Sequence, residues 1–224
     1  MSDRVVNDCH LDPERLRPFQ ECMETYGIGV ETDDPHDPQG EWPHNCISTQ
    51  TVAYSCGLIS RADATVEHNH DAAELAQCWR LAHQASEIMD GIAVGFGSES
   101  EDYFRPFFVT AARDAPAPER LNEAVIRAAF GGTIYPVAEI VIEPLVPSAN
   151  GWQRVAKREA ETRQAWRNLI NWFHSQPELK SPAFVSIGSD PLSDDNGGCV
   201  FPRLAIALTP AGSLVGICGY VVYT

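Results

Sequence analysis

Long apolar runs and a leader segment are both missing from this sequence of 224 residues. The longest apolar stretches, 201–208 and 214–223, are far shorter than the roughly 20 apolar residues that a membrane-spanning helix needs. The first four residues, MSDR, are not a basic segment followed by an apolar one, which is the pattern of a secretory signal. We therefore expect a soluble, cytoplasmic protein.

Close cysteine pairs are also missing, because no two cysteines stand in a Cys-x-x-Cys arrangement. The number of cysteines is odd and their spacing is irregular. Without a secretion signal, such a set predicts reduced thiols that are buried as small apolar residues. The seven cysteines are Cys9, Cys22, Cys46, Cys56, Cys78, Cys199 and Cys218.

Basic residues are scarce in the first half of the chain. Residues 1–111 carry twenty Asp and Glu against six Arg and no Lys, a net charge of −14, whereas residues 112–224 carry eleven acids against ten bases, a net charge of −1. Together these make up the formal charge of −15. A field of this sign repels nucleic acids and anionic membranes and attracts basic proteins. We expect a basic protein partner, and neither nucleic acid nor membrane.

Two acidic segments, 31–43 and 98–102, stand out in the first half and are the predicted partner-binding surface. Complementary charge of this kind speeds the association of two proteins. The predicted contact residues are Glu31, Asp33, Asp34, Asp37, Glu99, Glu101 and Asp102.

Four helices are expected from apolar residues that recur with a period near 3.6, over 13–26, 72–89, 118–130 and 151–174. The second has the best start signal, because Asp71 and Glu74 form a capping-box pattern and Gly91 follows the end. Pro18 conflicts with a helix that begins at Pro13, so a later start is equally possible there.

The other regular segments are strand candidates at 46–59, 92–96, 104–112, 133–143, 182–188, 201–208 and 213–223. The last two are joined by Thr-Pro-Ala-Gly at 209–212, which is typical of a type I turn. The sequence predicts an α+β fold with a mixed or mainly antiparallel sheet of about five to eight strands, about four helices and a C-terminal β-hairpin. Residues 1–224 are expected to form a single domain, with a possible sub-boundary near 113–119.

Two polar triplets, His44-Asn45-Cys46 and His68-Asn69-His70, predict a metal site. Ligands at i and i+2 of an extended chain point to the same side, so each triplet presents two donors. Together His44, Cys46, His68 and His70 would suit zinc in number and chemistry. The alternative is that the second triplet is only the polar start of the helix capped by Asp71.

Two functions therefore remain open. The first is a non-catalytic interaction module, similar in its use of charge to an inhibitor or immunity protein, which presents an acidic surface to a basic partner. The alternative is a small metal-dependent enzyme, such as a hydrolase, with the His/Cys set as its zinc centre.

Overall fold

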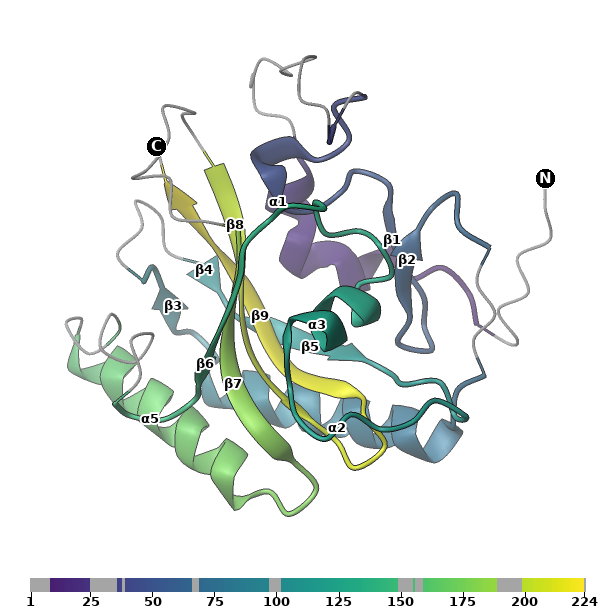
Figure 1. The fold of residues 1–224 in the computed structure, drawn as a ribbon. Helices are drawn as coiled ribbons and strands as arrows, with labels where there is room; N and C mark the ends of the chain where they lie inside the picture. Colours follow the sequence, from purple (N-terminus) through teal and green to yellow (C-terminus); the bar gives the residue numbers. More distant parts are fainter. Residues whose placement is uncertain are drawn as a thin grey trace.

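The computed structural model has a five-stranded antiparallel sheet at its centre, in the order β5-β9-β8-β7-β6 (Figure 1). These strands span Arg105–Val109, Leu214–Tyr223, Cys199–Leu208, Lys180–Ile187 and Ile140–Pro144. The structure describes residues 9–24, 36–37, 39–65, 69–96, 102–148, 155, 159–188 and 199–223. Within these residues, the predicted α+β fold with a mainly antiparallel sheet is confirmed.

The remaining elements of the described part are short strands and helices around this sheet. Two two-stranded sheets consist of β1 (Thr51–Ala53) with β2 (Ile59–Arg61), and β3 (Ala93–Val94) with β4 (Asp102–Tyr103). The α-helices are α1 (Gln20–Met23), α2 (Ala72–Ile88), α3 (Glu123–Ala129) and α5 (Ala160–Ser175), and the 3-10 helices are η1 (Pro13–Phe19) and η2 (Pro43–Asn45). Among the described helices, none is both long and apolar enough to cross a bilayer.

The predicted C-terminal hairpin is confirmed by the longest strand pairing in the sheet, which joins β8 to β9. Its register runs from the pair Cys199–Tyr223 to the pair Leu208–Leu214. The turn closes where Gly212 N donates to Thr209 O at 3.0 Å, as a type I turn requires. Because β9 lies between β5 and β8, the end of the chain is built into the sheet.

The central sheet is covered on both faces. In Figure 1, α2 and α5 lie on one side, and η1, α1 and α3 lie on the other. Neighbouring residues of β5 show this division, because successive side chains of a strand point to opposite faces. Phe107 packs edge-on against Phe19 of η1 and stacks on Phe130 after α3, whereas Phe108 joins Leu81 of α2 in a separate cluster.

The predicted helices are correct in place and differ in length. The helix predicted over 13–26 is split into η1 and α1, because Pro18 has no N–H to donate and its ring crowds the preceding turn. Helix α3 begins at Glu123 rather than near Pro118, since the Asn122 side chain caps it by accepting from Val125 N at 3.1 Å. Helix α5 runs over the second part of the predicted 151–174, and residues 151–154 and 156–158 of that prediction lie outside the described residues.

The strand predicted over 46–59 is wrong as a single strand. The chain turns back at Tyr54–Leu58, so that β1 and β2 pair with each other. Gly57 makes this turn possible with a φ of +94°, a left-handed value that disfavours other residues. The strand predicted over 133–143 is also shorter than expected, because β6 begins only at Ile140.

Candidate functional site

The predicted ligands His44 and Cys46 lie in the interior, where each donates a hydrogen bond to a main-chain carbonyl oxygen. His44 Nε2 donates to the carbonyl oxygen of Glu24 at 2.8 Å, and the Cys46 thiol donates to the carbonyl oxygen of Val200 at 3.2 Å. Both side chains are buried. These contacts fix η2 between the end of α1 and the start of β8.

Four cysteines are reduced and buried, as predicted, and three of them have a raised pKa. Burial raises the pKa of Cys22 well above its usual value, and the neighbouring Cys46 adds to this. Burial also raises the pKa of Cys218, and it raises that of Cys78 to about 12 with help from the Glu74 charge. A thiol that stays protonated is a poor nucleophile, so these three residues serve packing.

Cys9 and Cys56 instead form a disulfide, so the prediction of reduced thiols is wrong for this pair. Their Cα atoms are 5.5 Å apart although 47 residues separate them in sequence. His70 lies beside the pair, with Nδ1 3.6 Å from Cys9 Sγ. Within the described residues, Cys9, Cys56 and His70 form the one group of three potential metal ligands whose ligand atoms lie close enough together to hold an ion. This group contains the predicted ligand His70 but neither His44 nor Cys46, and His68 lies outside the described residues.

Two of the predicted partner-binding acids, Asp37 and Asp102, are described and both are buried. The Asp37 carboxylate accepts from the main-chain N–H groups of Glu41 and Trp42, which holds the turn that follows it. The Asp102 carboxylate accepts from Tyr220 N at 3.2 Å and so joins β4 to β9. The other five, Glu31, Asp33, Asp34, Glu99 and Glu101, lie outside the described residues.

Two acids of the first half nevertheless come close in the fold: Glu21, which precedes the segment 31–43, and Asp102, the last residue of the segment 98–102. Helix α1, which carries Glu21, lies against β8, and β4 lies against the neighbouring strand β9. Burial raises the pKa of Asp102, and the negative charge of Glu21 adds to this shift. Burial, Asp102 and Glu21 together raise the pKa of Tyr220 to about 12. The field around this tyrosine is therefore negative, although Arg105 partly opposes it.

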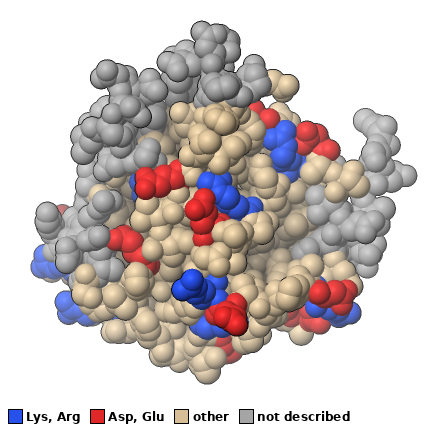
Figure 2. All heavy atoms as spheres, in the orientation of Figure 1, with Lys and Arg blue, Asp and Glu red and all other residues tan. Residues whose placement is uncertain are grey.

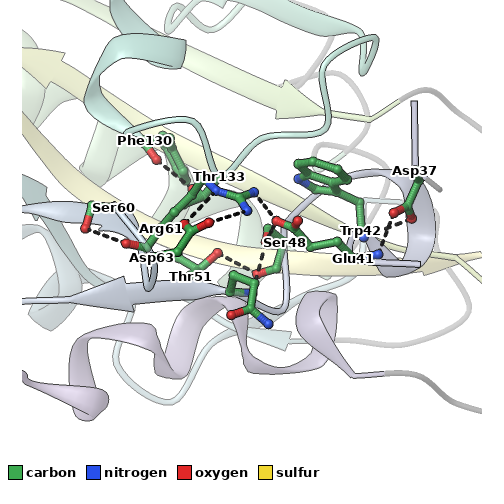
Figure 3. Close-up of polar contacts among 11 residues, drawn as sticks. Asp37, Glu41, Trp42, Ser48, Thr51, Ser60, Arg61, Asp63, Phe130 and Thr133 are labelled. Atoms are coloured by element: carbon green, nitrogen blue, oxygen red, sulfur yellow. Dashed lines mark hydrogen bonds and ion pairs between the residues drawn. The ribbon is translucent and has the colours of Figure 1, made fainter. Parts of the chain in front are cut away.

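Arg61 neutralises two other acids of the first half (Figure 3). Its guanidinium forms ion pairs with Glu41 and with Asp63, the latter at 3.0 Å. These hydrogen bonds, first with Asp63 and then with Glu41, raise the pKa of Arg61. Ser48 donates a further hydrogen bond to Glu41. The network ties β2 to the segment around η2, so these carboxylates have a structural role.

An open depression of about 460 Å³ runs along η1 and α1. Its lining includes two apolar side chains, Leu16 and Met23, and two carboxylates, Glu14 and Glu24. Arg17 also lines it and forms an ion pair with Glu14 at 3.4 Å. Pro13 and Gln20 complete the lining. The depression thus combines apolar surface with carboxylates, and it lies along the helix that also carries Glu21.

The surface charge of the described part is mixed on the face drawn in Figure 2, where acidic and basic side chains lie next to one another. Acids and bases also pair within single elements, as Glu123 and Arg127 of α3 do at 2.8 Å. The sequence alone predicts neither the Cys9–Cys56–His70 group nor the role of Glu21, since both depend on contacts between residues that are distant in sequence.

A scan against protein-family models and a search of curated proteins find no match to this chain.

Proposed function

We propose that this protein is a non-catalytic interaction module that binds a basic protein partner through the acidic surface around α1 and β4. The observation that carries the proposal is the placement of α1, with Glu21, and β4, with Asp102, against the neighbouring strands β8 and β9, so that both acids raise the pKa of Tyr220. Glu21 precedes the acidic segment 31–43, and Asp102 is the last residue of the acidic segment 98–102. A concentrated negative field at one edge attracts and orients a cationic partner.

The depression along η1 and α1 supports the same proposal, because its chemistry suits a lysine or arginine side chain. Long basic side chains bury their methylene groups on apolar surface and keep the charge near solvent. Leu16 and Met23 would contact the methylene groups, and Glu14 and Glu24 would face the cation. The partner's cation would compete with Arg17 for Glu14.

The test is binding of a fluorescent oligolysine peptide, measured by fluorescence anisotropy at several salt concentrations. We expect E14Q/E24Q to weaken binding about 5-fold, since two exposed charge pairs at about 0.5 kcal/mol each contribute about 1 kcal/mol. The matched control, E119Q/E139Q, removes the same charge from two exposed residues on other elements. It should bind within about twofold of wild type because it leaves the depression intact.

A second peptide separates the depression from the overall charge of the protein. A peptide of 2,4-diaminobutyric acid keeps the charge of oligolysine but shortens each side chain by two methylene groups. We expect weaker binding to wild type and a smaller difference between the peptides in E14Q/E24Q. Equal losses in E14Q/E24Q and E119Q/E139Q would show that only the net charge attracts the peptide, and would contradict the proposal.

A further inference from the structure

Cys9, Cys56 and His70 bring three metal-binding side chains together from separate parts of the chain. Cys9 precedes η1, Cys56 lies in the turn between β1 and β2, and His70 directly precedes the cap of α2. The three ligand atoms lie within 4.8 Å of one another. Cys56 is buried, whereas Cys9 and His70 are half-buried.

Main-chain hydrogen bonds hold the two cysteines together independently of their disulfide. Ser55 N donates to His10 O, and Asp12 N donates to Ala53 O, both at 2.9 Å. The Thr110 hydroxyl donates to the carbonyl oxygen of Cys56 at 2.6 Å and holds the turn from the side of β5. The two sulfur atoms would therefore remain neighbours if the bond between them were broken.

His70 is held at the group by contacts on both sides of it. Arg113 N donates to Asn69 O at 2.8 Å, and the Arg113 guanidinium forms an ion pair with Asp71 at 3.0 Å. Asp71 also caps α2 by accepting from Ala73 N at 2.8 Å and Glu74 N at 3.2 Å. The ring is thus placed by the start of a 17-residue helix.

We infer that the reduced form of this group binds a zinc ion through both thiolates and the imidazole of His70. Zinc bonds to sulfur are about 2.3 Å and to histidine nitrogen about 2.0–2.1 Å, which places ligand atoms of a tetrahedral site about 3.5–3.8 Å apart. The distance of 3.6 Å between Cys9 Sγ and His70 Nδ1 lies within this range. Two thiolates with one imidazole suit zinc, with water at the fourth position.

The disulfide and the metal exclude each other, because metal binding by these cysteines requires thiolates. A dithiol reductant breaks the sulfur–sulfur bond, transfers two electrons and two protons to Cys9 and Cys56, and becomes a cyclic disulfide itself. Zinc then displaces the two thiol protons and binds. The site is therefore open to metal only in the reduced protein.

The test uses the full chain, either oxidised or reduced with a dithiol that is then removed without air. Cobalt(II) replaces zinc as a spectroscopic probe, and zinc is titrated against it in competition. The reduced protein should bind one cobalt per chain with a thiolate-to-cobalt charge-transfer band. The oxidised protein should bind at least about 100-fold more weakly, because it lacks both thiolates.

The variant His70→Asn leaves both cysteines in place and should weaken zinc binding to the reduced protein at least about 10-fold. The matched control is His10→Asn. His10 is an exposed histidine next to Cys9, and its ring contacts Ser55 at 3.3 Å. It should bind zinc as wild type does. Absence of the cobalt band in the reduced protein, or equal affinities of H70N and H10N, would overturn the inference.

Discussion

Two glycines that follow helices offer a matched test of how α3 is fixed against β2. Gly131 follows α3 with a φ of +56°, and Gly91 follows α2 with a φ of +72°. An added Cβ at Gly131 would lie 2.5 Å from the carbonyl oxygen of Ile59 and 3.0 Å from Ser60 Cα. At Gly91 nothing lies within 4 Å of it. The two positions thus share backbone strain and differ in packing.

We therefore expect Gly91→Ala to lower the free energy of unfolding by about 1 kcal/mol, the cost of a left-handed conformation for alanine. Gly131→Ala adds a clash with main-chain atoms that cannot rotate away. Overpacking of this kind costs about 1–3 kcal/mol more, which gives a total loss of about 2–4 kcal/mol.

Urea unfolding followed by tryptophan fluorescence measures both losses. The relevant quantity is the difference between the two variants, because strain common to both cancels. A gap of at least about 1 kcal/mol supports the close approach of Gly131 to β2. Equal losses would show that α3 shifts away from Ile59 at little cost, and would refute the reasoning.

Two further substitutions test Asp102, which is buried, and Arg15, which is half-buried. Asp102→Asn should gain stability relative to wild type as the pH rises from about 4, the ordinary pKa of aspartate, towards neutrality. The pKa of Asp102 is raised in the native state, so wild type loses stability over that interval and the variant does not. Urea unfolding at about pH 4 and about pH 7 checks this, and the matched control is Asp114→Asn, which removes a carboxylate from an exposed position. Arg15→Lys should lower the free energy of unfolding by about 2–3 kcal/mol, because Arg15 donates to three main-chain oxygens and lies 4.2 Å from the Phe108 ring centre. The exposed Arg17→Lys should change it by less than about 0.5 kcal/mol.

The parts of the fold that the sequence predicts well are those whose signals are local. Helix α2 begins one residue after Asp71, whose side chain caps it as the Asp71–Glu74 pattern indicates. The β8–β9 hairpin is likewise found from its turn residues. In both cases the residues that decide the structure are close together in sequence, so no knowledge of the rest of the fold is needed.

The turn between β1 and β2 shows why other elements are missed. Larger apolar residues alternate with the small residues Ala53, Ser55 and Gly57 from Val52 to Leu58, so the pattern alone favours one strand. The chain turns at Gly57 instead, where Thr110 N donates to Gly57 O at 3.3 Å. An added Cβ at Gly57 would lie 2.7 Å from the Thr110 side chain. The turn thus depends on Thr110, which directly follows β5 and lies 53 positions after Gly57 in the sequence.

The candidate sites were harder to predict than the fold for the same reason. Spacing in sequence paired His70 with His44 and Cys46, whereas the structure places it beside Cys9 and Cys56. The pairing of cysteines cannot be deduced from sequence spacing when their number and order allow many combinations. Only the antiparallel contact of residues 9–12 with residues 53–55 brings the two sulfur atoms together.

Charge counting has a similar limit, because it treats every carboxylate as equally available to a partner. Asp37 and Asp102 accept main-chain hydrogen bonds inside the protein, and Glu41 pairs with Arg61. Such acids contribute to the long-range field but cannot contact a partner directly. The proposed interaction therefore depends on acids that a partner can reach, such as Glu14 and Glu24 beside the depression. Asp102 and Glu21 contribute through their negative charge, which together with burial raises the pKa of Tyr220.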